Sequence, residues 1–265
     1  MENKSKVKSA PSILTSSPIK LQQPGYISDE TQVCAEANNL PGLQYLATLD
    51  QLLIKQTIEV LEVVVGFETV NKYEVLNSIG QSVYKAEEDS ECCHRFRCGS
   101  GRGFDMTLTG NDGQEVIHLQ RPLRCQDCCF PCCLQEMEVS SPPGTVIGSI
   151  SQQWSIFHPK LLVKDDLGHP VLRIEGPCMT FSWCGSDVDF NVVSVETGEK
   201  IGKITKQWTG LAKEMSTDAD NFGITFPLDL DVKVKATLLG ALFLVDFMYF
   251  EHDAKFKQKL DVFFM

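Results

Sequence analysis

The residues best suited to bind a metal ion form an acidic segment near the C-terminus. Asp218 and Asp220 are separated by one residue, and Gly223 follows them. Ca²⁺ favours carboxylate oxygens, and an EF-hand loop has acids at its positions 1 and 3 and a glycine at position 6. Phe222 and Asp229 depart from that loop at positions 5 and 12. The pattern is compatible with weak calcium binding, roughly 10⁻⁴–10⁻³ M, and also with a polar turn before an edge strand.

Thiols are concentrated in a second segment, residues 125–133, with the sequence CQDCCFPCC. Cysteines exposed beside a membrane can carry acyl chains, and stable anchoring takes more than one chain. The candidates are Cys128, Cys129, Cys132 and Cys133. The CxxC spacing also suits zinc, but no histidine lies close by and adjacent cysteines crowd a tetrahedral site. The residues alone leave acylation, zinc binding and unmodified thiols as alternatives.

The basic residues and histidines form no recognisable catalytic or phosphate-binding motif. Lys203 and Lys206 precede Trp208 in a segment that, taken alone, is typical of a strand with solvated charges. None of the five histidines lies in a HExxH or nucleophile-elbow context. The glycine-rich stretch 99–103 lacks the Lys-Ser/Thr of a phosphate-binding loop. The sequence therefore predicts a protein without covalent catalysis.

The composition is that of an acidic globular protein. The 265 residues carry 24 Lys+Arg and 35 Asp+Glu, a formal net charge of -11, and 43% are hydrophobic. This length allows one large domain or two small ones, and the hydrophobic fraction excludes wholesale disorder. The charge makes nucleic acid an unlikely partner. The 11 cysteines, after an N-terminus without an apolar signal segment, predict a reducing compartment.

Most of the chain that positions these segments is predicted to be β-strand. Residues 1–42, rich in Ser, Lys and Pro, predict a disordered tail, so 43–265 are the folded domain. A short helix is expected near 43–51 and a strand over 57–65. Five strand–turn–strand units with turn glycines follow. Their predicted strands are 72–76 with 81–84, 105–108 with 115–119, 135–139 with 146–150, 161–163 with 171–174, and 190–195 with 201–204.

So many strands need an arrangement that protects their edges. The return strands 147–154 and 201–208 are near copies, which indicates repetition of a hairpin unit. The ten hairpin strands, the strand over 57–65 around Val60 and one more expected near Phe226 bring the total to about twelve. A closed antiparallel barrel leaves none of these edges unpaired.

The C-terminal region breaks the β pattern. Residues 236–250 (ATLLGALFLVDFMYF) are apolar on every side except at Asp246. Such a helix is either enclosed by protein or spans a membrane. Its length of about 22 Å falls short of a bilayer core of about 30 Å, and Asp246 at mid-membrane would cost roughly 2.5–3.5 kcal/mol. We therefore expect a helix over about 235–251 buried inside the barrel, with a membrane-spanning helix as the alternative.

Several motifs resemble those of the phospholipid scramblase family. They are LPGLQYL at 40–46, NKYEV at 71–75, GQEV at 113–116, RPLRC at 121–125, CCLQE at 132–136, GPC at 176–178, DVDF at 187–190 and TDADNFGI at 217–224. The resemblance extends over about residues 40–252. It implies a mainly β fold: a closed, antiparallel, 12-stranded Tubby-like β-barrel that encloses a hydrophobic C-terminal helix.

The resemblance also implies an activity and its sites. Members of the family are calcium-responsive and move phospholipids between bilayer leaflets without ATP. Their calcium segment corresponds to the ligand positions Asp218, Asp220, Phe222, Ile224, Phe226 and Asp229. Their palmitoylated stretch corresponds to Cys128, Cys129, Cys132 and Cys133, with a departure at Phe130. Their nuclear-import segment corresponds to Lys203, Lys206 and Trp208.

Location and partners follow from the same resemblance. It implies the cytoplasmic face of the plasma membrane, a nuclear pool, contact with phospholipid, signalling partners, and oligomers on calcium binding. The tail has neither PPxY nor PxxP, so family partners that bind those motifs are not expected. The alternative is a non-transporting, membrane-tethered adaptor of the same architecture that binds lipid or protein.

Overall fold

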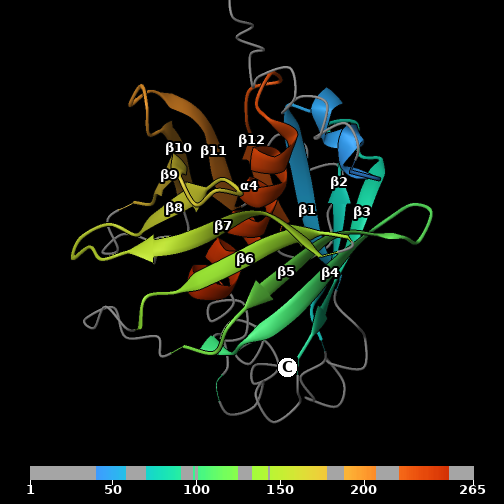
Figure 1. Ribbon diagram of the computed structural model, residues 1–265, viewed down its shortest axis with the longest axis horizontal. Coiled ribbons are helices and arrows are strands. Elements are labelled where there is room, and N and C mark those ends of the chain that lie inside the picture. Colours follow the sequence, from blue (N-terminus) through green and yellow to red (C-terminus); the bar gives the residue numbers. More distant parts are fainter. Residues whose placement is uncertain are drawn as a thin grey trace, which may run out of the picture.

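The computed structural model describes residues 40–57, 70–90, 98, 101–124, 133–142, 144–177, 188–206 and 221–250. Within these ranges the chain forms a closed antiparallel barrel around a C-terminal helix (Figure 1). The strands are β1 (Gln51–Thr57), β2 (Lys72–Leu76), β3 (Ser82–Asp89), β4 (Phe104–Gly110), β5 (Glu115–Arg121), β6 (Glu136–Ser141), β7 (Thr145–Gln153), β8 (Lys160–Lys164), β9 (Pro170–Glu175), β10 (Val188–Ser194), β11 (Lys200–Lys206) and β12 (Asn221–Thr225). The helical elements are the 3₁₀-helix η1 (Leu43–Thr48), the α-helix α4 (Val232–Val245) and the π-helical turn η5 (Asp246–Phe250).

The barrel closes where β1 pairs with β12. Each strand is antiparallel to its neighbours in sequence, and Leu52 of β1 lies opposite Ile224 of β12 in the closing pair. Side chains alternate between the interior and the outer face, as in β4, where Phe104, Met106 and Leu108 are buried. Closure leaves both edges of the sheet paired. The predicted twelve-stranded barrel is confirmed.

All five predicted hairpins are confirmed, with strand ends that differ by a few residues. Gly113 and Gly144 have φ values of 76° and 101° in two of the turns, a region that favours glycine. The expected helix near 43–51 is instead a 3₁₀-helix that ends at Thr48. Strand β1 already begins at Gln51, because Leu52 and its two successors are buried in the barrel wall. Residues 58–65 of the expected strand over 57–65, and the tail 1–39, lie outside the described residues.

Helix α4 lies inside the barrel (Figure 1), and all of its residues from Lys235 to Val245 are buried. The ring of Tyr73 on β2 meets Phe243 edge-on at 5.1 Å, while Phe104 on β4 stacks on Phe247 at 4.2 Å. The predicted enclosed helix is confirmed. It begins earlier than expected because the Asp231 carboxylate accepts hydrogen bonds from two amides of the first turn.

The two ends of the barrel differ. Tight turns connect β2–β3, β4–β5, β6–β7, β8–β9 and β10–β11 at one end, which we call the turn end. The longer connections that follow β1, β3, β5, β7, β9 and β11 start at the opposite end, the loop end. Lys233 near the start of α4 pairs with Asp166 of the β8–β9 turn. The helix therefore begins at the turn end and finishes, at η5, near the loop end.

Candidate functional site

A buried lysine holds the start of α4 in place. The Lys235 ammonium donates to the backbone carbonyls of Leu46, Leu49 and Leu228 at 3.1, 2.8 and 2.8 Å. Burial lowers the pKa of Lys235, and this effect is opposed by three acids, Asp229, Asp50 and Asp231. The lysine thereby joins η1, the segment after β12, and the helix at the turn end.

A second polar network lies at the loop end. Arg102 and Glu88 form a bidentate ion pair at 2.6 and 2.8 Å, and both side chains are buried. The Arg102 guanidinium also lies 4.7 Å from the centroid of the Phe247 ring in η5. Burial alone would raise the pKa of Glu88, but the hydrogen bonds and charge of Arg102 outweigh it and hold that pKa below its ordinary value. This pair connects β3 to the end of the helix.

The described part of the calcium segment is a strand. Phe222 and Ile224 are fully buried in β12, whose backbone pairs with β1 on one side and β11 on the other. Phe226 is also buried, and the exposed Asp229 lies beyond the strand, in the connection to α4. Asp218 and Asp220 lie outside the described residues. Calcium binding by this segment stays a prediction.

Few of the other predicted site residues fall within the described ranges. Cys133 is buried, and its carbonyl accepts a hydrogen bond from the Gln135 side chain, whereas Cys128, Cys129 and Cys132 lie outside. Trp208 also lies outside the described residues. Both lysines of the basic segment have partners. Lys203 pairs with Asp189 at 3.5 Å, and the Lys206 ammonium lies 4.7 Å from the centroid of the Phe250 ring.

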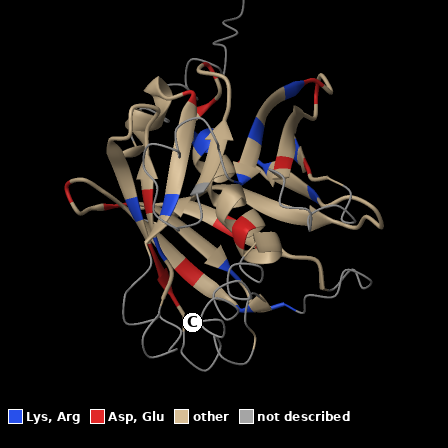
Figure 2. Ribbon diagram, turned by 180° about the vertical axis from the view of Figure 1, so that it is seen from behind, with Lys and Arg blue, Asp and Glu red and all other residues tan. Residues whose placement is uncertain are grey.

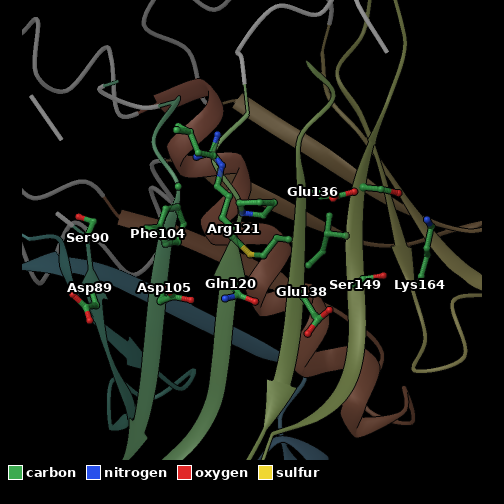
Figure 3. Close-up of a pocket in the computed structure, with 16 residues that line it drawn as sticks. Asp89, Ser90, Phe104, Asp105, Gln120, Arg121, Glu136, Glu138, Ser149 and Lys164 are labelled. Atoms are coloured by element: carbon green, nitrogen blue, oxygen red, sulfur yellow. The ribbon is translucent and has the colours of Figure 1, made fainter. Parts of the chain in front are cut away.

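The outer wall of the barrel carries a polar hollow that the sequence motifs did not indicate (Figure 3). It has a volume of about 950 Å³. One polar residue from each of six consecutive strands lies directly opposite the next along its floor: Asp89, Asp105, Gln120, Glu138, Ser149 and Lys164. The predicted strands contained Asp105, Glu138 and Ser149 but ended short of the other three residues, and only the register of the strands aligns the row.

The row has an electrostatic direction. At one end, Asp89 and Asp105 are like charges on directly opposed positions, an arrangement that costs stability in a sheet. At the other end, Ser149 lies opposite Lys164. The serine supplies a hydroxyl group and the lysine an ammonium group. Such a surface is suited to cationic groups at its acidic end and to anionic groups at its basic end. Figure 2 shows that acidic and basic residues are otherwise interspersed over the barrel.

Among the described residues, every helix is too short or too polar to cross a bilayer. Within those same ranges, His, Cys, Asp and Glu side chains form no group of three arranged to hold a metal ion.

Comparison with known proteins identifies relatives. The family model described as Scramblase matches residues 30–252. Phospholipid scramblase 2 of Bos taurus is 57% identical over 80% of this chain and 72% of its own length. Phospholipid scramblase 1 of Homo sapiens is 54% identical over 84% of this chain and 70% of its own length. A solved structure from Arabidopsis thaliana aligns with a TM-score of 0.43 and 14% identity, over 77% of this chain and 96% of that one. The chain belongs to the scramblase family.

Proposed function

We propose that this protein moves phospholipids between membrane leaflets without ATP. The observation that carries the proposal is 54% identity to human phospholipid scramblase 1 across 84% of the chain. The family model matches residues 30–252, a range that includes the whole barrel and its helix rather than a single motif. Moving a lipid between leaflets forms and breaks no covalent bond, so the proposal needs no catalytic group.

The polar hollow supports a path for headgroups on the outer wall of the barrel. The interior is filled by α4, so a headgroup cannot pass through it. Neighbouring strands lie about 4.8 Å apart, and Glu138, Ser149 and Lys164 occupy three of them side by side. A zwitterionic headgroup would place its phosphate at Lys164 and Ser149 and its ammonium at Glu138. A hydrophilic row of this kind lets the headgroup exchange water for protein contacts.

Calcium would act through Asp218 and Asp220. The backbone groups of Phe222 and Ile224 are engaged in pairing with β1 and β11. Because those carbonyls are occupied, the carboxylates of the segment are the ligands best placed to bind Ca²⁺. Neutralising these acids would lower the repulsion between a protein of net charge -11 and an anionic leaflet. Acyl chains on Cys128, Cys129 and Cys132 would supply the anchor at the cytoplasmic face. A nuclear pool and signalling partners remain expectations from the family.

The test is lipid exchange in vesicles that contain the purified full-length chain. Fluorescent phospholipid in the inner leaflet should become accessible to an external quencher when calcium is added. The Asp218→Ala/Asp220→Ala variant should lose the calcium response. The matched control is Glu196→Ala/Glu199→Ala, which removes two exposed acids from the β10–β11 turn, outside the calcium segment, and should keep it. Lipid exchange equal to that of protein-free vesicles, with and without calcium, would contradict the proposal.

The second candidate is a non-transporting adaptor that binds the membrane. The enclosure of α4 favours it, because an enclosed helix gives the barrel no lipid-facing helical surface. Vesicle binding without any lipid exchange would support this alternative.

A further inference from the structure

The connection between β7 and β8 exposes three large apolar side chains. Trp154, Ile156 and Phe157 are 55%, 67% and 66% exposed. Contact with water costs free energy for each of them, roughly in proportion to the apolar area exposed. Three such residues within four positions of one loop form a patch rather than the scattered exposure that is normal on a surface. We call this loop, residues 154–159, the apolar tip.

The base of the apolar tip is held by hydrogen bonds. The Gln152 amide donates to the Gln135 carbonyl at 2.7 Å, and the Gln135 amide donates to the Gln152 side chain at 3.0 Å. On the other side, the Gly176 amide donates to the Pro159 carbonyl at 2.9 Å. The tip is therefore presented on an anchored base, which lowers the entropy lost on binding.

The tip and the two strands that carry it, β7 and β8, contain no acidic residue. The chain has 35 acidic residues in 265, yet none occurs from 139 to 164. Two basic or titratable residues lie at the tip itself: His158 within it and Lys160 at its base, opposite Glu175 of β9. A surface that combines tryptophan, other apolar side chains and positive charge matches the interface of an anionic bilayer, where amphipathic rings and lysines are favoured.

The position of the tip fits the same partner. It lies at the loop end, and the Gln135 side chain that neighbours its base donates to the Cys133 carbonyl at 3.0 Å. Cys133 is the last residue of the cysteine segment. Acyl chains on that segment and the apolar tip would reach the membrane from the same end of the barrel.

We propose that the apolar tip inserts into the headgroup region of an anionic phospholipid membrane and fixes the orientation of the barrel with its loop end toward the lipid. This inference rests on the proposed function, because that function places the protein at a membrane. It concerns binding to the membrane and not the exchange of lipid between leaflets. The two can therefore fail separately.

The test uses the full-length chain, freed of thioester-linked acyl chains with hydroxylamine, and vesicles of phosphatidylcholine and phosphatidylserine. Ile156→Ser/Phe157→Ser should weaken vesicle binding by roughly tenfold or more, since burial of such side chains contributes more than the free energy equivalent to one decade of affinity. The matched control is Ile79→Ser/Leu167→Ser, which removes two side chains that are 73% and 76% exposed at the turn end. The control should bind like the wild type.

A second measurement reports insertion directly. Trp183→Phe/Trp208→Phe leaves Trp154 as the single tryptophan of the three. Its emission should shift to the blue on vesicles and be quenched by lipids brominated in the acyl chain near the headgroup. Unchanged emission, or equal weakening by the control pair, would overturn the proposal. A change from dimer to monomer in solution on Ile156→Ser/Phe157→Ser, with vesicle binding intact, would assign the tip to contact between copies instead. Normal insertion without lipid exchange would leave this inference standing and contradict only the proposed scrambling.

Discussion

The hydroxyl of Tyr73 on β2 donates a 2.8 Å hydrogen bond to the carboxyl group of Asp246 at the start of η5. Both side chains are buried. The acid that interrupts the apolar helix is therefore met by a polar group of the barrel wall, a partner that a lipid chain does not supply. This contact accounts for an acid in an otherwise apolar segment, and it ties α4 to the barrel.

A double-mutant cycle on Tyr73 and Asp246 measures how much their interaction contributes to the free energy of unfolding. Tyr73→Phe and Asp246→Ala should each destabilise the fold, and we expect a coupling of about 1–3 kcal/mol between them. The free energy of unfolding of the wild type, both single variants and the double variant gives the coupling. Additive effects would show that the two residues do not interact in the folded protein.

The buried Glu88–Arg102 pair predicts acid sensitivity. Because the pKa of folded Glu88 lies below its ordinary value of 4.5, the stability that the pair contributes is complete above that pH. It is lost as the pH falls through the lower folded value. Removal of one partner by Glu88→Gln should cost about 3–5 kcal/mol near neutral pH.

Urea unfolding at a series of pH values checks this prediction. The stability difference between the wild type and Glu88→Gln should shrink as the pH falls below 4.5. Glu87→Gln is the matched control, since Glu87 is 64% exposed and its pair with Lys72 contributes at most about 1 kcal/mol. A difference that stays constant down to about pH 2 would contradict the role given to the ion pair.

Lys235 should be essential for the turn end. Lys235→Met removes the donor of three hydrogen bonds and leaves buried carbonyls with fewer partners, at an expected cost of about 2–5 kcal/mol. Lys233→Met, two residues earlier, loses only the contact with Asp166 near the surface and should cost about 1 kcal/mol or less. Thermal unfolding compares the two, and equal losses would argue against the buried lysine as the anchor.

Two glycines test how closely the barrel fits the helix. A Cβ at Gly148 would lie 2.3 Å from the Thr237 Oγ1 and 2.7 Å from the Lys164 carbonyl oxygen. Gly148→Ala should therefore destabilise the protein by about 1–3 kcal/mol. At Gly240 the nearest atoms are ends of side chains at 3.0 and 3.1 Å, and alanine also favours the helix by about 1 kcal/mol. We expect Gly240→Ala to be nearly neutral, and the reverse order in chemical denaturation would contradict the packing described.

The parts of the fold that were predicted correctly depend on local patterns. Each hairpin has its own turn glycine and alternating strands, and the helix has an apolar run that only Asp246 interrupts. The start of β1 was missed because Leu43, Leu46 and Leu49 continue into Leu53 at helical spacing, while burial in the barrel wall decides the outcome. The polar hollow depends on register across six strands, and no single segment contains that information. The exposure of Phe157 likewise depends on how the rest of the chain packs.

We expect α4 to stay inside the barrel while the loop end meets the lipid. Photolabelling of the full-length chain on vesicles, with a photoreactive group in the lipid acyl chain, tests it directly. Peptides from the labelled protein are then identified by mass spectrometry. Label is expected on the peptide that contains Trp154 and Phe157 and not on residues 236–245. Label distributed along 236–245 would contradict this expectation and place the helix in the bilayer.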